Sequence, residues 1–230
     1  MLKHSNKPII YLENVWKIYQ VGDVQVEALR GITLSINLGE FVAITGPSGS
    51  GKSTMMNMVG ALDVPTKGAI YLDGKDISKL YESDLAEIRG KKIGFVFQQF
   101  NLIPNMTALE NVMLPLEFQD AKDAKERAIK VLEMVGLKDR MYHKPKELSG
   151  GQQQRVAIAR ALANDPEVIL ADEPTGNLDS KIGKEIMELF KKLHNQGKTI
   201  VLITHDIDLA NFGERVIKLV DGKIIGGDKK

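Results

Sequence analysis

The segment GPSGSGKS has the residue types and the spacing that bind phosphate groups. Its glycines let the backbone wrap closely around phosphate oxygens, with amide N–H groups and a helix N-terminus pointing at them. Lys52 would add positive charge toward β and γ phosphates, and the Ser53 hydroxyl would bind magnesium. The apolar FVAIT segment before the motif and a helix expected from about Ser53 disfavour a plain Gly/Ser-rich loop. The predicted nucleotide-binding residues of this segment are Gly46, Pro47, Ser48, Gly49, Ser50, Gly51, Lys52, Ser53 and Thr54.

Two carboxylates stand directly after another apolar segment, VILA. Asp172 and Glu173 thus occupy the position where ligand groups gather in an open α/β sheet, at the carboxyl end of a strand. Asp172 is a candidate to hold magnesium through its water shell, and Glu173 to polarise a water that attacks a γ-phosphate. The alternative, a solvated turn before Pro174, loses weight beside the phosphate-binding segment.

The same position recurs after two further apolar segments, where Gln98 follows IGFVF and His205 follows TIVLIT. A glutamine can hold magnesium or an attacking water, and a histidine can donate a hydrogen bond to a γ-phosphate oxygen. Gln99 competes with Gln98 for this role, because spacing alone does not separate them. A histidine at a strand end is also often a structural hydrogen-bonding group.

A second candidate anion site lies in LSGGQQQRVAIARALA, residues 148–163. Ser149 is expected to cap a helix that carries Val156, Ala159 and Ala163 on one side. The Ser149 side chain and the backbone amides of the two following glycines would hold an anion. One nucleotide cannot obviously use two such sites on different lobes of one chain.

The elements that must position these residues follow from hydrophobic patterning. FVAIT, IGFVF, VILA and TIVLIT are nearly continuous apolar runs, typical of parallel strands covered on both faces. Alternation over residues 9–44 predicts an antiparallel β region, and RVIKLV-DG-KII predicts a closing hairpin with its turn at Asp221-Gly222. Residues 128–135 and 182–193 have helical spacing and end near a glycine.

Together these elements predict an α/β fold of the P-loop NTPase kind. Its core sheet is expected to be mainly parallel, with an N-terminal antiparallel β subdomain and a helical subdomain inserted in the core. The 230 residues suit one domain of two lobes. We expect the nucleotide-binding core to span residues 1–97 and 161–230, and the helical subdomain to span about residues 98–160.

Composition excludes several classes of protein. Thirty-one basic and 30 acidic residues give a net charge of +1, which provides no strong field for a polyanion such as nucleic acid. The absence of cysteine excludes disulfides and zinc-thiolate sites and suits a reducing compartment. No apolar run approaches the ~20 residues of a membrane span. A cytoplasmic protein that reaches a membrane only through a partner is expected.

The order of the motifs resembles that of the ATP-binding cassette (ABC) ATPases, the motor subunits of ABC transporters. LSGGQ lies between GPSGSGKS and VILADEPT, and Asn177-Leu178-Asp179 and Thr204-His205-Asp206 follow, without departure from the pattern. The resemblance covers essentially the whole chain. It implies ATP hydrolysis with magnesium, and a head-to-tail homodimer in which each ATP lies between one copy's phosphate loop and the other copy's LSGGQ.

The resemblance also implies a role for each matched residue. Tyr19 resembles the aromatic residue that stacks on adenine, although Trp16 competes for that role. Magnesium is expected at Ser53 and Gln98, and at Asp172 through water. The residues expected to act in catalysis are Glu173, His205 and Gln98. The residues expected to reach the partner's nucleotide are Leu148, Ser149, Gly150, Gly151, Gln152 and, in the D-loop, Asp179.

A finer resemblance, carried by LDVPTKG and GFVFQQFNLIPNMTALENVMLP, is to subunits that drive lipoprotein-release and macrolide-export systems. It implies an integral membrane permease as partner and a location on the inner face of the cell membrane. The apolar residues around Gln98–Leu116 either contact that permease or pack within the helical insertion.

The alternative is a non-transport ABC ATPase of the DNA-repair or translation type. The DNA-repair type needs a long coiled coil, and the roughly 95 residues between the phosphate-binding segment and LSGGQ show no sustained heptads. The translation type usually carries two cassettes in one chain. A non-catalytic nucleotide sensor would be expected to lack Glu173 or His205, and both are present.

Overall fold

The computed structural model describes residues 8–229. Residues 1–7 and 230, which the predicted domain bounds include, lie outside the described residues. The strands are β1 (Pro8–Val21), β2 (Val24–Asn37), β3 (Phe41–Thr45), β4 (Lys67–Leu72), β5 (Lys75–Asp76), β6 (Ile93–Val96), β7 (Val168–Asp172), β8 (Thr199–Ile203), β9 (Arg215–Val220) and β10 (Lys223–Lys229). The helices are α1 (Lys52–Val59), α2 (Glu82–Lys92), α3 (Ala108–Glu117), α4 (Ala124–Met134), η1 (Lys138–Arg140), η2 (Pro145–Glu147), α5 (Gly150–Leu162), α6 (Ser180–Asn195) and α7 (Ile207–Ala210).

A six-stranded sheet forms the centre, in the order β10-β9-β3-β8-β7-β6. Its ladders from β9 to β6 are parallel, and the β9–β10 hairpin adds an antiparallel edge strand. The apolar runs form these strands because both faces of the sheet are covered by other elements. The predicted mainly parallel core sheet is therefore confirmed. The carboxyl ends of β3, β6, β7 and β8 lie at one edge, where the predicted site residues follow them.

A second sheet, in the order β2-β1-β4-β5, is antiparallel throughout and holds the N-terminal part of the chain. The antiparallel pairing of the first hairpin extends to the Pro8–Asn37 pair. The predicted antiparallel region is confirmed up to that pair, whereas β3 pairs with β8 and β9 in the parallel sheet.

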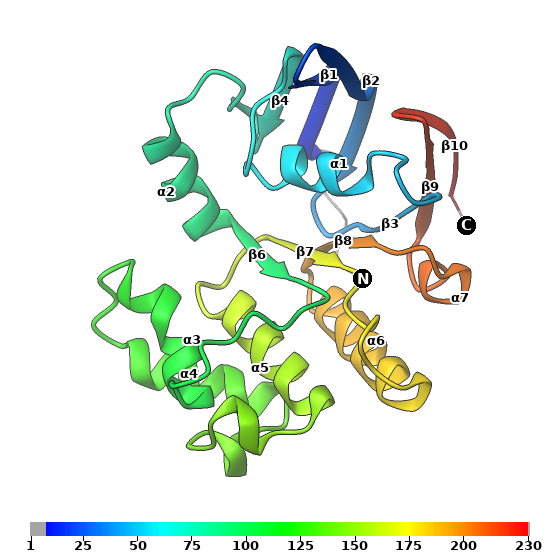
Figure 1. Ribbon diagram of the computed structural model, residues 1–230. Helices are drawn as coiled ribbons and strands as arrows, with labels where there is room; N and C mark the ends of the chain where they lie inside the picture. Colours follow the sequence, from blue (N-terminus) through cyan, green and yellow to red (C-terminus); the bar gives the residue numbers. More distant parts are fainter. Residues whose placement is uncertain (1–7, 230) are drawn as a thin grey trace.

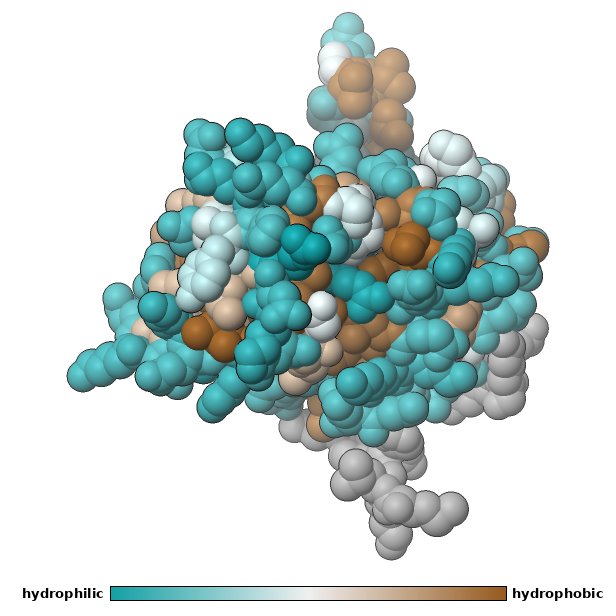
Figure 2. All heavy atoms as spheres, turned by 90° about the horizontal axis from the view of Figure 1, so that it is seen from below, coloured by the Kyte–Doolittle hydropathy of each residue, from teal (hydrophilic) through white to brown (hydrophobic). Residues whose placement is uncertain are grey.

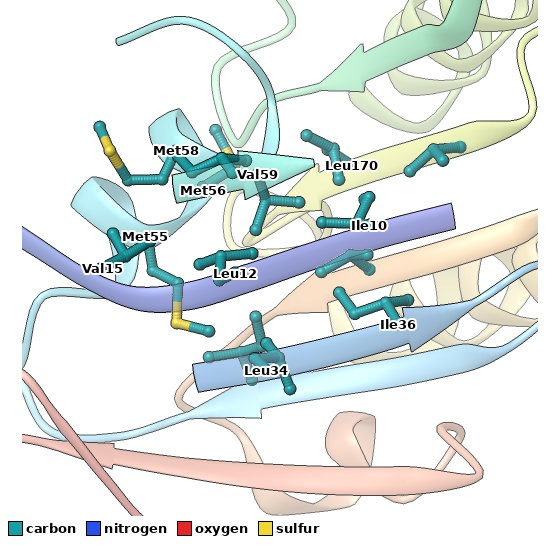
Figure 3. Close-up of a cluster of buried hydrophobic side chains, with 14 of the residues drawn as sticks. Ile10, Leu12, Val15, Leu34, Ile36, Met55, Met56, Met58, Val59 and Leu170 are labelled. Atoms are coloured by element: carbon teal, nitrogen blue, oxygen red, sulfur yellow. The ribbon is translucent and has the colours of Figure 1, made fainter. Parts of the chain in front are cut away.

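The core between the two sheets is built around α1 (Figure 1). In Figure 3, Met55, Met56 and Met58 of α1 lie in a cluster of buried apolar side chains that includes Leu12 of β1, Leu34 of β2 and Leu170 of β7. These methionines are buried, as expected of core residues rather than chemical groups. Since α1 is wedged between the sheets, its first turn and the phosphate-binding segment before it are held rigidly.

Helices α3, α4, α5 and α6 share a second buried cluster with the opposite face of the central strands. Thr107 caps α3 and forms a capping box with Glu110, which fixes the start of this helix. In Figure 2, which views the molecule from the side of these helices, hydrophilic residues predominate and apolar ones lie in the hollows between them. The residues between β6 and α5 form α3, α4 and the short helices η1 and η2, as the sequence indicates.

None of the helices within residues 8–229 combines the length and the apolar character that a membrane crossing requires.

Candidate active site

The phosphate-binding segment is a loop in which two glycines, Gly46 and Gly51, have no room for a side chain. A Cβ at Gly46 would lie 2.1 Å from the carbonyl oxygen of Leu219. At Gly51 the backbone φ is +99°, and a Cβ would lie 2.5 Å from the carbonyl oxygen of Ala28. Close contact with β9 and β2 thus fixes the loop, and only glycine fits both places.

Lys52 folds back across this loop. Its ammonium group donates to the carbonyl oxygens of Gly46 at 2.8 Å and Pro47 at 2.9 Å. Ser50 is buried at 2% exposure, and its carbonyl oxygen accepts a hydrogen bond from the backbone of Gly222 at 3.0 Å. The Lys52 cation is therefore held at the loop, where it can meet an anion that the loop binds.

One cleft, with a volume of about 830 Å³, brings several of the predicted residues together, although His205 is not among the residues that line it. It joins the loop, the start of α1, the β7 carboxylates and Gln98 with the β2 strand and the β9–β10 turn. Its lining residues are Gln25, Val26, Glu27, Ala28, Arg30, Ser48, Gly49, Gly51, Lys52, Ser53, Thr54, Gln98, Asp172, Glu173, Asp221 and Gly222.

Glu173 is the most constrained side chain in this cleft. Its oxygens accept hydrogen bonds from the His205 backbone at 2.9 Å and from the Thr204 hydroxyl at 3.3 Å, and the His205 ring Nδ1 lies 2.7 Å from Oε1. The Glu173 backbone has a positive φ of 46°, which is strained for a residue with a side chain. The Glu173 side chain is 17% exposed and the His205 side chain 75%, so the histidine is the more open of the two.

Burial raises the pKa of the Asp172 carboxyl, and the negative charge of Glu173 adds to the rise, whereas Lys52 partly offsets it. The charged form of the Asp172 carboxyl is therefore disfavoured in this half-buried position. A cation bound in the cleft would relieve that cost.

Gln98 lines the cleft, and Gln99 is not among its lining residues. The Gln98 backbone carbonyl accepts a hydrogen bond from the Asn177 amide at 2.9 Å, and the two side chains lie 3.4 Å apart. A Cβ on Gly176 would lie 2.7 Å from Nε2 of Gln98. The segment after Glu173 thus holds the glutamine in place.

The signature residues, Leu148–Gln152, do not line this cleft. Ser149 caps α5 and forms a capping box with Gln152, as the sequence predicts. Asp179 caps α6 by accepting hydrogen bonds from two backbone amides. The first turns of α5 and α6 lie close together, because a Cβ on Gly151 would lie 2.5 Å from the Ile182 side chain. The signature residues are therefore separated from the cleft that the phosphate-binding segment lines.

Tyr19 is half-buried in β1 and is not among the residues that line the cleft. It pairs with Val26 of β2, which does line it, so the tyrosine lies one strand away. Its hydroxyl donates to Asp63 at 3.3 Å, and the Lys17 ammonium lies 5.1 Å from its ring centre. Trp16 donates its indole N–H to Asn14 at 3.2 Å.

The sequence did not reveal the β2 strand residues and the β9–β10 turn as walls of the cleft. The Asp221-Gly222 dipeptide was recognised as a turn, but its approach to the loop is a tertiary contact. Positive φ values at Asp221 (46°) and Gly222 (74°) confirm that turn.

Comparison with known proteins places the chain in one family. The sequence pattern of the family described as ABC transporter matches residues 29–176. An uncharacterized ABC transporter ATP-binding protein of Thermotoga maritima is 54% identical over 226 residues, which cover 97% of this chain and 97% of that protein. The macrolide export ATP-binding/permease protein MacB of Bdellovibrio bacteriovorus is 50% identical over 94% of this chain, which covers 33% of MacB.

A solved structure agrees. The cassette MJ0796 of Methanocaldococcus jannaschii, described as a dimer in a post-hydrolysis state bound to ADP and Pi, superposes with a TM-score of 0.88 and 54% identity. The match covers 96% of this chain and 98% of that one. The chain belongs to the ABC transporter family, as an ATP-binding subunit. The predicted P-loop fold is confirmed with it.

Proposed function

We propose that the chain is the ATP-hydrolysing motor subunit of an ABC transporter, with specific roles for the residues of the cleft. One observation carries the proposal: the phosphate loop, the β7 carboxylates and Gln98 line a single cleft. Loop amides and Lys52 bind the phosphates, and Glu173 orients a water whose oxygen bonds to the γ-phosphorus as the bond to ADP breaks. His205, held by Glu173, donates to a γ-phosphate oxygen.

Magnesium fits the donors of this cleft. The Ser53 hydroxyl, the Gln98 amide oxygen and the Asp172 carboxylate all line it, and oxygen ligands are the set that magnesium prefers. Ser53 and Gln98 would hold the ion directly, and Asp172 through water. Bound there, magnesium would neutralise charge on the β- and γ-phosphate oxygens.

Two copies are proposed to close head-to-tail on two ATP molecules. Because Leu148–Gln152 lie outside the chain's own cleft, they can meet a phosphate only on a second copy. MJ0796, the relative with the similar fold, is a dimer. Asp179, whose helix cap neighbours Gly151, accompanies the signature to the partner. Tyr19 is assigned to the adenine. It pairs with Val26 of the neighbouring strand β2, which lines the cleft.

The partner is proposed to be an integral membrane permease, which places the chain on the cytoplasmic face of the membrane. The structure holds a mainly apolar groove between β6, α3 and α5, with a volume of about 340 Å³. Phe118 on its rim is 77% exposed, and Phe97, just before Gln98, lines its floor. A permease segment in this groove would therefore touch the loop that carries a magnesium ligand. The residues between β6 and α5, about 98–160, form the proposed helical subdomain.

The groove changes which apolar residues are proposed to contact the permease. Leu102 packs against the helical core, and Phe100, Ile103 and Met106 are half-buried, whereas Phe118 at the groove is exposed. The similarity to MacB, a macrolide export ATP-binding/permease protein, supports an export system with a permease partner. A lipoprotein-release system rests on the resemblance of the sequence motifs. A DNA-repair type is disfavoured, because the helices within residues 54–149 are at most 11 residues long.

Substitution Lys52→Ala tests the proposal. The variant loses the cation that the loop positions, so we expect ATP affinity to fall about tenfold or more. The affinity is measured by titration calorimetry without a partner protein, with Lys144→Ala on the exposed helical side as the control. Unchanged ATP binding in Lys52→Ala would contradict the proposed phosphate site.

A further inference from the structure

Gln154 is a buried polar side chain that joins three elements of the fold. It lies in α5 and has an exposed fraction of 0%. Its side-chain amide donates to the carbonyl oxygen of Pro174 at 2.6 Å and to that of Phe97 at 3.5 Å. Pro174 directly follows Glu173, and Phe97 directly precedes Gln98. Both acceptors are thus backbone neighbours of residues assigned to hydrolysis.

Packing alone does not explain a glutamine at this position. Its neighbours Val156 and Ile158 on the same helix are apolar and fully buried. Within residues 8–229, no donor reaches the Gln154 carbonyl oxygen, so the side chain carries an unpaired buried acceptor. A methionine of similar length would avoid that cost. The glutamine instead contributes the two hydrogen bonds that its amide donates to the carbonyl oxygens of Pro174 and Phe97.

These bonds connect the two places that a head-to-tail dimer uses on different nucleotides. Helix α5 begins at the signature residues, which are assigned to the partner's ATP. The carbonyl groups of Phe97 and Pro174 belong to the segments that carry Gln98 and Glu173, which are assigned to the chain's own ATP. Since a helix moves as a rigid body, any displacement of α5 must change or break these bonds.

We propose that Gln154 is a positioning residue, which sets Glu173 and Gln98 according to how the signature helix is seated on the partner. This inference rests on the proposed roles of those two residues and on the proposed dimer. Gln154 does not line the cleft, so binding of ATP to a single chain does not depend on it. Loss of its bonds would slow hydrolysis and weaken the coupling between the two sites.

The test compares Gln154→Met with Gln153→Met. Gln153 is the matched control, because it is the next residue in the same helix and its amide donates at 3.1 Å to Leu148, at its own helix start. For Gln154→Met we expect kcat to fall about tenfold or more with the Kd for ATP within about twofold of wild type. The Hill coefficient for ATP is expected to fall toward one. Gln153→Met is expected to keep all three values.

Three results would overturn the proposal: a kcat of Gln154→Met near wild type, an equal loss of ATP affinity, or the same kcat loss in Gln153→Met. Gln154→Asn keeps an amide on a shorter side chain and carries the test if the methionine variant does not fold. Its kcat is expected to fall by less, with unchanged affinity, and full activity would count against the proposal. If Glu173→Gln hydrolyses ATP normally, the proposed function fails. If only the Gln154 variants are normal, the positioning role alone fails.

Discussion

The proposed hydrolytic chemistry depends on the contact between His205 and Glu173. The ring nitrogen lies 2.7 Å from the carboxylate of Glu173, which lines the cleft, and the histidine side chain is exposed. Removing the ring in His205→Ala takes away a donor to the developing charge, so we expect kcat to fall about 100-fold. Steady-state ATPase assays check this. His143→Ala, on the helical side, is the control and is expected to keep wild-type activity; equal activity in both would refute the role of His205.

The raised pKa of Asp172 predicts that its carboxylate lowers stability at neutral pH, while its proposed association with magnesium supports activity. Its folded-state pKa is raised above 3.8 by burial, so the folded chain binds a proton more tightly than the unfolded chain does. Stability therefore falls as pH rises through the window from 3.8 to the raised pKa, and above it the charged carboxylate is unfavourable. Asp172→Asn removes that cost.

We accordingly expect Asp172→Asn, without nucleotide, to melt at or above the wild-type temperature at pH 7, with the difference vanishing at acid pH. Its magnesium-dependent ATPase is expected to fall about tenfold or more, since a magnesium-associated carboxylate is lost. Differential scanning calorimetry and an ATPase assay are the measurements. A lower melting temperature at pH 7 would contradict the direction of the pKa effect.

Sequence reasoning reached the residues that carry a chemical signature of their own. Glu173 and His205 could be predicted because each directly follows a buried strand, which fixes its place in space. Asp221 and Gly222 could not be assigned to the cleft, because only tertiary folding brings their turn to the loop. Gln154 gave no signal either, since a glutamine inside a helix is ordinary until its burial and its carbonyl partners are known.

At the scale of elements, the loop between β3 and α1 is where backbone geometry matters most. Gly51 has a positive φ and would bring a Cβ to 2.5 Å from the Ala28 carbonyl oxygen, whereas Gly136 has φ +77° with open space around it. Gly136→Ala is therefore expected to cost only the left-handed strain, about 1–2 kcal/mol. Gly51→Ala adds a steric clash in the loop itself.

We expect Gly51→Ala to lose more stability than Gly136→Ala and also to lose ATP affinity by about tenfold or more, because the loop must shift. Urea unfolding and ATP titration measure the two effects. Similar stability and normal ATP binding in Gly51→Ala would show that the loop tolerates a side chain there.

Strands with continuous apolar runs were predictable, and weakly patterned elements were not. In β4 only Ile70 and Leu72 are buried, and in α2 only Leu85 is buried. Each segment therefore has too few buried apolar residues to reveal its hydrophobic periodicity in the sequence. The formation of β4 depends on its pairing with β1, and that of α2 depends on its packing against β6. Buried Asn111 in α3 is similar, because its hydrogen bonds to the loop at Ile103 and Met106 become apparent only in the folded chain.

At the scale of the whole molecule, the proposed function needs a second copy to complete each nucleotide site and a permease at the exposed groove. The chain's near-neutral charge does not oppose phosphate binding, because loop amides, Lys52 and magnesium would meet the phosphate charge locally. The sequence already indicates two candidate anion sites that one nucleotide cannot obviously use. That a second copy completes them follows from family membership.

Phe118→Glu tests the groove. A charge on this exposed rim should exclude a permease segment, so we expect membrane-partner recovery from detergent-solubilised membranes to fall about tenfold. Basal ATPase activity and melting temperature should stay unchanged, because the side chain is 77% exposed. Tyr142→Glu, at an exposed site elsewhere on the helical side, is the control. Equal recovery with Phe118→Glu and wild type would place the permease contact elsewhere.

Glu173→Gln tests the central claim most directly, because it removes the carboxylate charge and keeps the side-chain shape. The measurement is ATP hydrolysis together with molar mass from size-exclusion chromatography and light scattering, with and without ATP. We predict that hydrolysis falls about 100-fold or more while ATP binding persists, and that the variant becomes a dimer only with ATP. Hydrolysis near the wild-type rate, or a mass that does not respond to ATP, would contradict the account.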